Sequence, residues 1–99
     1  MRGDLARPAA TPTKLLDDER VRVTRWTFEA GAETGWHRHQ LDYVIVPMTE
    51  CQLLLEEGGA ERRVEVDAGE VYCREAGVAH NVVNGGDAPM SFIEIEIKP

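Results

Sequence analysis

The sequence predicts an all-β fold, a small sandwich or barrel that forms a single domain. Short alternating or apolar runs, each bounded by turn residues, recur roughly every 8–12 residues. No stretch of about ten residues after the N-terminal segment shows the 3.6-residue period of an amphipathic helix. With 99 residues, the chain is the length of one domain and has no room for a second.

The predicted barrel follows an N-terminal arm at residues 1–19. Proline, glycine and alanine in its first 13 positions indicate a loose arm or an extended edge segment. We assign residues 20–99 to the barrel, with seven or eight short strands. The clearest seven are residues 20–28, 37–47, 52–55, 62–66, 70–74, 81–84 and 90–98.

The first two strands have different patterns. Residues 20–28 (RVRVTRWTF) alternate and end before Ala30-Gly31, which is typical of a half-buried strand. Residues 37–47 follow the turn at Gly35. Within them, positions 41–46 are apolar on both parities, which predicts a strand covered on one face by the core and on the other by a second layer or a partner subunit.

Turn signals separate the later strands. They are Glu57-Gly58-Gly59, Asp67-Ala68-Gly69, Gly77 and Gly85-Gly86-Asp87. The first of them predicts a β-hairpin, because glycine accepts the positive φ values of a tight hairpin turn. In residues 90–98, Ile93, Ile95 and Ile97 share one face and Glu94 and Glu96 the other, so we expect the isoleucines to face the core.

The charge balance excludes two classes of partner. Eleven Lys and Arg against 18 Asp and Glu give a net charge of -7, which argues against nucleic acid and against anionic membranes. No apolar run has the length of a secretory signal or a membrane span, so we expect a cytoplasmic protein. Cys51 and Cys73 form no CxxC pair and are predicted to be buried, reduced thiols.

The small size predicts additional stabilisation. A domain of this length buries only about 60–65% of its unfolded surface, so its core is marginal alone. We expect a homodimer, a bound metal, or both. The doubly apolar run at 41–46 and the aromatic side chain of Trp36, opposite in parity to His37, are the candidate interface.

The three histidines of the chain are candidate metal ligands. His37 and His39 are separated by one residue, so in a strand both imidazoles point to the same face, about 6.5–7 Å apart along the chain. Their ring nitrogens would then converge on one ion at about 2.0–2.1 Å. His80 follows a glycine turn that would fold it back beside this pair. The alternative is that the histidines are ordinary core or surface residues.

The spacing around the histidines resembles that of a known family. The first segment reads Gly31-x5-His37-x-His39-x3-Tyr43, and the second reads Gly69-x5-Glu75-x-Gly77-x2-His80-x3-Asn84. Together they resemble the two motifs of the cupin family, Gly-x5-His-x-His followed by Glu and Gly, and Gly-x5-Pro-x-Gly-x2-His-x3-Asn.

The resemblance covers residues 20–97. The two segments are similar to those of a subgroup of very small single-domain cupins, some of them labelled with beta-alanine degradation. It implies a jelly-roll-like cupin β-barrel with His37, His39 and His80 as the ligands of a divalent transition metal. Fe, Zn, Ni and Mn are the candidates, and an empty site is the alternative. Because the imidazoles bind metal when neutral, metal affinity is expected to fall below about pH 6–6.5.

One departure from the motif affects the chemistry. The glutamate of the first cupin motif is replaced by Tyr43 or Val44. Tyr43 is our candidate catalytic residue. It would bind the metal weakly, donate a hydrogen bond to oxygen bound there, or simply pack in the core. Asp42 would need a bulge to reach the site, and Glu94 or Glu96 would reach it only if the last strand faced the opposite way.

Three functions remain open from the sequence. The first is a non-haem, metal-dependent oxidoreductase, dioxygenase-like, acting on a small organic molecule. The second is a non-catalytic module that binds a metal or a small ligand, as a sensor or a sequestering protein. The third is a structural cupin with vestigial histidines. Arg74 and Tyr72 would hold an anionic substrate if they lined the pocket, but Arg74 is also expected to form a surface pair with Glu75.

Overall fold

The computed structural model describes residues 6–99, which form strands and turns without a helix. The nine strands are β1 (Thr11–Asp17), β2 (Val21–Phe28), β3 (His37–Arg38), β4 (Asp42–Pro47), β5 (Cys51–Glu57), β6 (Ala60–Val66), β7 (Tyr72–Arg74), β8 (Ala79–Asn84) and β9 (Met90–Ile97). The predicted all-β class is confirmed. Within the described residues there is no helix that could span a membrane.

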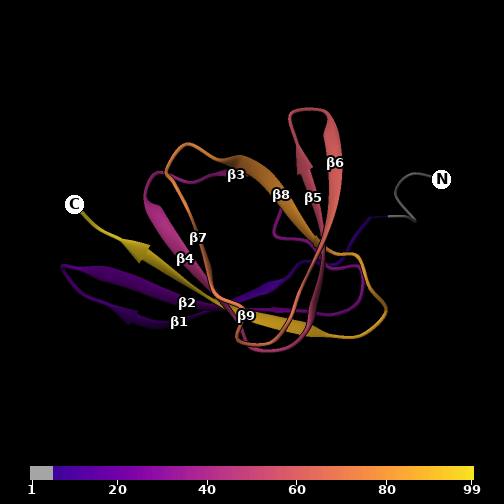
Figure 1. The fold of residues 1–99 in the computed structure, drawn as a ribbon, viewed down its shortest axis with the longest axis horizontal. Coiled ribbons are helices and arrows are strands. Elements are labelled where there is room, and N and C mark those ends of the chain that lie inside the picture. Colours follow the sequence, from indigo (N-terminus) through magenta and orange to yellow (C-terminus); the bar gives the residue numbers. More distant parts are fainter. Residues whose placement is uncertain (1–5) are drawn as a thin grey trace.

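The strands form two sheets that enclose the core. A five-stranded sheet has the order β1-β2-β9-β4-β7, and a four-stranded sheet has the order β3-β8-β5-β6. All strand pairs within the sheets are antiparallel. In Figure 1 the β3-β8 edge arches over β4 and β7, so that the first motif and the second motif come together at one end of the barrel.

Side chains that alternate along the strands fill the space between the sheets. Phe28 at the end of β2 is fully buried, and its ring lies 5.4 Å from that of Phe92 on β9. Tyr43 and Ile45 of β4 and Leu55 of β5 are buried beside them. Burial of this apolar surface is the main term that stabilises the small barrel.

The hairpin between β5 and β6 is confirmed. Its ladder runs to the pair Glu57 and Ala60, which leaves Gly58 and Gly59 as a two-residue turn with φ values of 55° and 85°. Positive φ at both central positions defines the tight turn whose twist matches that of the strands, and glycine adopts it without strain.

The expected strand at 37–47 is two strands in different sheets. β3 pairs with β8 in the four-stranded sheet, whereas β4 pairs with β7 and β9 in the other. The chain crosses between the sheets at residues 39–41. The prediction of one strand was wrong. Residues 37–46 contain no glycine or proline, so the sequence carries no turn signal for this crossing.

The segment before the barrel contributes an edge strand. Residues 11–17 of the predicted arm form β1, which pairs with β2 at the edge of the five-stranded sheet and is exposed along its length. Residues 1–5 of the arm lie outside the described residues. With β1 and the two-residue β3 included, the described residues form nine strands rather than seven or eight.

The last strand faces the opposite way from our expectation. Phe92 and Glu94 are buried and face the inside of the barrel, whereas Ile93 and Ile95 are half-buried and Ile97 is exposed on the outside. The alternation was read correctly, but its assignment to the two faces was wrong. The physical reason is that the interior here includes polar groups that hold Glu94, while the outer surface of the sheet is itself apolar.

One cysteine was also misplaced. Cys51 is buried as predicted, but Cys73 is exposed, and both thiols are free. Cys73 lies in β7 between Tyr72 and Arg74, both half-buried, so alternation turns it outward. Burial raises the pKa of the Cys51 thiol, which keeps it protonated and unreactive at neutral pH.

Candidate metal centre

The three histidines of the sequence come together at one end of the barrel. His37 of β3 lies directly opposite His80 of β8 in the sheet, and His39 follows β3. The Nε2 atom of His39 lies 3.0 Å from Nε2 of His37 and 3.1 Å from Nε2 of His80. Donor atoms that share an ion at about 2.0–2.1 Å are separated by roughly 3.0–3.4 Å. The cluster therefore has the dimensions of a metal site.

Backbone hydrogen bonds hold the two histidine segments together. The His39 N–H donates to the carbonyl of Val78 at 2.8 Å, and the Gly77 N–H donates to the carbonyl of His39 at 2.8 Å. Gly77 has a φ of 104°, a conformation that L side chains rarely adopt. This turn brings His80 back beside His39, as the sequence predicts.

The outer ring nitrogens face acceptors. Nδ1 of His37 donates to the carbonyl of Gly35 at 2.8 Å. Nδ1 of His39 lies 3.6 Å from Glu94 Oε2, and buried Nδ1 of His80 lies 3.8 Å from Glu57 Oε2, without a hydrogen bond to it. Such surroundings favour a proton on Nδ1 and leave the lone pair on Nε2. Three lone pairs then point at one another, an arrangement that a cation stabilises.

Asn81 supports the loop before β3. Its Oδ1 accepts the N–H of Gly35 at 2.9 Å, and its amide donates to Glu33 and Glu56 at 2.8 and 2.9 Å. Because the carbonyl of Gly35 accepts from His37, Asn81 supports the orientation of that imidazole through the backbone of Gly35. Sequence reasoning missed this residue. The only signal for it was its position next to His80.

Burial keeps two of the imidazoles neutral. It lowers the pKa of His39 and of His80 to about 4, with a further lowering from the neighbouring His37. Both are therefore unprotonated at pH 7, the form that binds a metal. The contact between His39 and Glu94 is then one of a neutral ring N–H with a carboxyl group, not an ion pair. For these two residues, the pH at which protons compete with a metal therefore lies below the value of 6–6.5 expected from the sequence.

We predict that the rings of His39 and His80 titrate near pH 4 in the metal-free protein, as followed by the NMR shifts of their ring carbons and protons. Their ordinary pKa of about 6.5 applies in the unfolded chain, so protonation between about pH 6.5 and 4 favours unfolding. Their contribution to stability is thus present above pH 6.5 and falls with pH, by up to about 1.4 kcal/mol per pH unit for each ring. Titration of both rings near pH 6.5 would contradict this account.

Tyr43 lies against the cluster. Its ring stacks on that of His39 with a centroid distance of 3.9 Å and an interplanar angle of 19°. Its hydroxyl is buried and has no hydrogen-bond partner. Burial raises the pKa of Tyr43 to about 12, so the phenol is a neutral donor at pH 7. The side chain thus packs in the core, one of the three roles considered from the sequence. It also directs an unused O–H into the interior.

The carboxyl group nearest the histidines comes from the last strand. Glu94 faces inward from β9, accepts a hydrogen bond from Trp26 Nε1 at 3.2 Å, and places its other oxygen beside His39 Nδ1. Burial raises its pKa, an effect that the Trp26 N–H opposes. Glu94 contacts the outer nitrogen of His39, on the side away from the Nε2 cluster. It is a positioning residue for the imidazole in this arrangement.

We expect Glu94→Gln to weaken the binding of Zn²⁺ by about 10–100-fold, because a carboxyl partner orients a metal-binding imidazole and raises its basicity. Equilibrium dialysis of the folded variant measures this. Glu65→Gln, an exposed change on β6, is the matched control and should leave the affinity unaltered. Equal affinities for the Glu94→Gln variant and the unaltered protein would show that Glu94 does not position His39.

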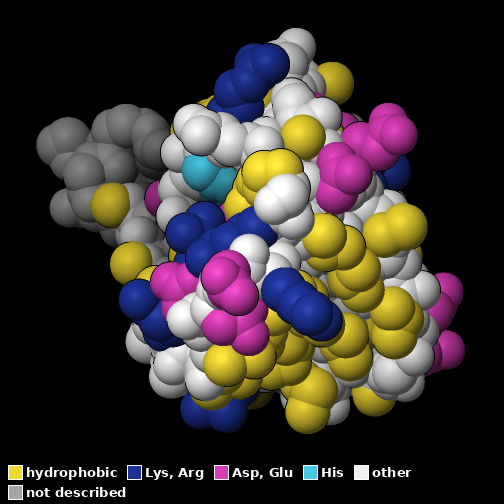
Figure 2. Space-filling view, turned by 90° about the vertical axis from the view of Figure 1, so that its left-hand side faces the viewer, with side chains coloured by type: hydrophobic (Ala, Val, Ile, Leu, Met, Phe, Trp, Pro, Cys, Tyr) yellow, Lys and Arg dark blue, Asp and Glu magenta, His cyan; other side chains and the backbone are white. Residues whose placement is uncertain are grey.

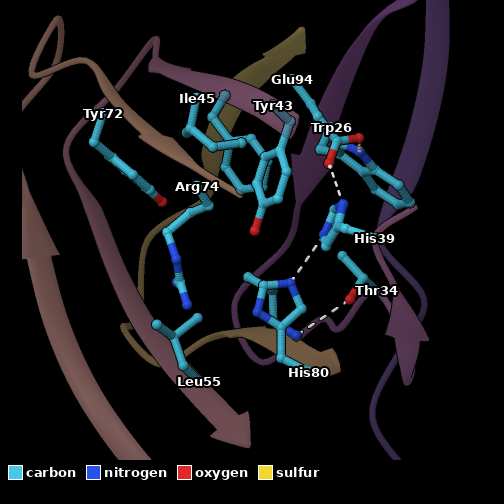
Figure 3. Close-up of a pocket in the computed structure, with 12 residues that line it drawn as sticks. Trp26, Thr34, His39, Tyr43, Ile45, Leu55, Tyr72, Arg74, His80 and Glu94 are labelled. Atoms are coloured by element: carbon cyan, nitrogen blue, oxygen red, sulfur yellow. Dashed lines mark hydrogen bonds and ion pairs between the residues drawn. The ribbon is translucent and has the colours of Figure 1, made fainter. Parts of the chain in front are cut away.

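A cavity lies next to the histidines. It has a volume of about 30 Å³, enough for one small group, and its lining includes His39, His80, Tyr43 and Glu94. Figure 3 shows the hydroxyl of Tyr43 directed into this space, with Arg74 and Tyr72 on the side away from His39. Figure 2 shows a small area of histidine surface, which agrees with His37 being only partly buried.

Arg74 points inward, not along the surface. Its guanidinium lies 3.5 Å from Glu57, and the side chain lines the cavity. The expected surface pair with Glu75 is wrong, because the Arg74 side chain at the end of β7 turns toward Glu57 of β5. Alternation places Tyr72 and Arg74 on one face of β7, and the structure turns that face into the barrel.

Comparison with known proteins agrees with this geometry. Residues 24–96 match the family described as "Cupin domain". The chain belongs to the cupin family. This cupin is 50% identical over 92 residues to the beta-alanine degradation protein BauB of Pseudomonas aeruginosa, a match that covers 93% of this chain and 97% of that protein. The resemblance to small single-domain cupins is thereby confirmed.

Solved structures show the same fold. A cupin domain from Bordetella pertussis Tohama I is 51% identical and superposes with a TM-score of 0.92, over 95% of this cupin and 98% of that chain. An RmlC-like cupin from Methanocaldococcus jannaschii, with a double-stranded β-helix fold, is 13% identical with a TM-score of 0.77, over 91% and 81% of the two chains. The second similarity concerns the fold alone.

Proposed function

We propose that this protein is a metal-dependent cupin that acts on a small organic molecule, as a non-haem, dioxygenase-like oxidoreductase. The observation that carries the proposal is the convergence of three Nε2 atoms on one point beside a cavity. Three neutral ligands leave the charge of a divalent ion uncompensated and leave coordination positions for a substrate.

The donor set is consistent with a divalent transition metal. Imidazole nitrogens suit Fe, Zn and Ni, whereas Mn, the fourth candidate, prefers oxygen ligands. His37, His39 and His80 would hold the ion. A ferrous ion bound there would supply redox chemistry with molecular oxygen.

The protein's own groups would bind and orient the substrate. Tyr43, our candidate catalytic residue, would donate its free O–H to an oxygen atom of the bound molecule. Its buried, unpartnered hydroxyl already points into the cavity. The apolar walls of the cavity and the stacked ring of His39 would exclude water from this contact. Desolvation of this kind strengthens a hydrogen bond to a polar substrate atom.

Oxygen consumption tests the proposal. Protein loaded with Fe(II) is expected to consume oxygen with at least one member of a panel of small carboxylates, thiols and diketones. Tyr43→Phe should lower that rate and leave metal affinity unchanged. Absence of turnover across the panel, with metal bound at the histidines, would instead favour the second function from the sequence, a binding module without catalysis.

We also propose a homodimer through the outer face of the five-stranded sheet. Val23, Ile95, Val44 and Cys73 are neighbours in register across β2, β9, β4 and β7, all outside the barrel. The half-buried valines and isoleucines form an apolar surface of the kind that marks subunit contacts. Light scattering should give twice the mass of the chain, and Ile95→Lys should give a monomer. A monomeric unaltered protein at micromolar concentration would contradict the dimer.

A cytoplasmic location is part of the proposal. Free cysteines are typical of proteins in reducing compartments, and Cys51 and Cys73 both carry free thiols. Fractionation of cells that express the chain from its own genome tests this location. Recovery with a periplasmic marker would contradict it.

A further inference from the structure

A second group of polar side chains faces the histidines across the cavity. Tyr43 of β4 pairs with Arg74 of β7, and Ile45 pairs with Tyr72 two positions further along the same antiparallel ladder, so all four share one face. All four line the cavity. Figure 3 shows the hydroxyl of Tyr43 directed into the cavity, with the Arg74 side chain extending beside Tyr72 toward Leu55. The wall opposite the metal site is therefore built from hydrogen-bond donors and one cation.

The hydroxyl of Tyr43 lacks an acceptor among the described residues. Tyr43 is 2% exposed, and its hydroxyl has no hydrogen-bond partner. A buried donor left without an acceptor destabilises the folded protein, so such a group is typical of a site that a ligand completes. Burial raises the pKa values of Tyr43 and Tyr72 to about 12, so both phenols carry their protons at neutral pH.

Arg74 is only weakly paired. Among residues 6–99 its one ion pair is with Glu57 at 3.5 Å, beyond the distance of a good hydrogen bond to a guanidinium. Glu57 is shared, because it also lies 3.4 Å from Arg62. It stands half-buried at the end of β5, next to the two-glycine turn. Most of the five donors of Arg74 therefore remain available for a second carboxylate, and Glu57 has Arg62 as an alternative partner.

A larger groove continues outward from the cavity. Its volume is about 480 Å³, and Leu55, Tyr72 and Arg74 line both spaces. The remaining apolar walls of the groove are Leu53, Val64, Val66 and Val71. A ligand that reaches from the cavity into the groove therefore passes Arg74 and then lies against aliphatic side chains. Pockets that are mostly apolar with a few convergent polar groups are typical of small-molecule sites.

We propose that the ligand of this cupin is a small aliphatic carboxylic acid whose carboxylate binds Arg74 and the hydroxyl of Tyr43. Its aliphatic part lies in the groove between β7 and the β5–β6 hairpin, and its carboxylate displaces Glu57 from Arg74. The inner cavity admits only the head of such a molecule, next to His39 and His80. This inference rests on the proposed function, for which it names the class of substrate.

Binding of pentanoate tests the inference without requiring turnover. Calorimetric titration of the metal-free and the Zn²⁺-loaded protein should show pentanoate binding, and pentanamide binding about 10–100-fold more weakly, since the amide lacks the charge that Arg74 recognises. Arg74→Leu should lower pentanoate affinity by a similar factor of about 10–100, and Arg74→Lys by less. Tyr43→Phe should lower it by about tenfold. Arg25→Leu, an exposed arginine on β2, is the matched control.

Several results would overturn the inference. They are equal binding of pentanoate and pentanamide, an unaltered affinity in folded Arg74→Leu protein, tighter binding of inorganic phosphate than of pentanoate, and no pentanoate binding by either form. Circular dichroism of each variant establishes whether it is folded. If Arg74→Leu does not fold, the conservative changes Arg74→Lys and Tyr43→Phe test the inference in its place.

The same samples separate this inference from the proposed function. Zn²⁺ affinity should be unchanged in Arg74→Leu, because Arg74 is not among the metal ligands. Metal binding without pentanoate binding would overturn the carboxylate site alone. Arg74-dependent pentanoate binding in a protein that takes up no metal would overturn the metal-dependent function alone.

Discussion

Replacement of His39 by alanine is expected to lower the affinity of the protein for Zn²⁺ by about 100-fold or more. Loss of a partner that merely orients a ligand costs about 10–100-fold, and loss of the ligand itself costs more. His39 is the central member of the cluster, because its Nε2 lies within 3.1 Å of the Nε2 atoms of both His37 and His80. Without it, two imidazoles remain, and neither has a carboxylate ligand beside it to compensate.

Thermal unfolding gives an independent measure of the same change. A metal that binds only the folded protein stabilises it by about 4 kcal/mol when its concentration is about 1,000 times its Kd. Zn²⁺ should therefore raise the melting temperature of the unaltered protein and of Gln40→Ala, an exposed neighbouring change, but not of His39→Ala. Each variant is compared with and without metal, so the stability that His39→Ala loses with the Tyr43 stacking cancels from the metal-induced shift. Equal stabilisation of His39→Ala by Zn²⁺ would show that the ion binds elsewhere.

Phe28→Ala is expected to destabilise the barrel by about 3–5 kcal/mol, the usual cost of removing a fully buried phenylalanine. Phe28 is 0% exposed, and its ring lies 5.4 Å from Phe92 and 6.3 Å from Trp26. A domain of this length has a free energy of unfolding of roughly 5–15 kcal/mol, so the loss is a large fraction of the total.

Urea unfolding followed by circular dichroism measures this loss in the metal-free protein. Thr27→Ala, one position earlier on β2 and exposed, is the control for the change in strand propensity. A loss below about 1 kcal/mol for Phe28→Ala would mean that the core between the sheets is not packed as described, because a well-packed site cannot close over so large a cavity.

The strands and the histidine cluster were accessible from the sequence for a physical reason. Alternation and glycine turns are local signals, so β2 and the β5–β6 hairpin follow from a few neighbouring residues. The spacing of His37 and His39 by one residue places them on one face, and the Gly77 turn returns His80 to the same place. The structure brings these three residues together as the spacing predicts.

The faces of β9 and β7 were not accessible from the same signals. Alternation separates two faces but does not say which is inside, and the usual rule selects the apolar one. In β9 the rule fails because Glu94 accepts a hydrogen bond from Trp26 and faces His39 in the interior, and because the outer face of the sheet carries its own apolar row. For Arg74, adjacency to Glu75 in the sequence concealed a partner, Glu57, that only the folded chain brings near.

The most direct test of a metal centre at the three histidines is anomalous X-ray scattering at the zinc edge, from crystals of protein without a histidine tag equilibrated with Zn²⁺. The account predicts an anomalous peak about 2.0–2.1 Å from the Nε2 atoms of His37, His39 and His80. A peak at other residues only, or none between these imidazoles, would contradict it.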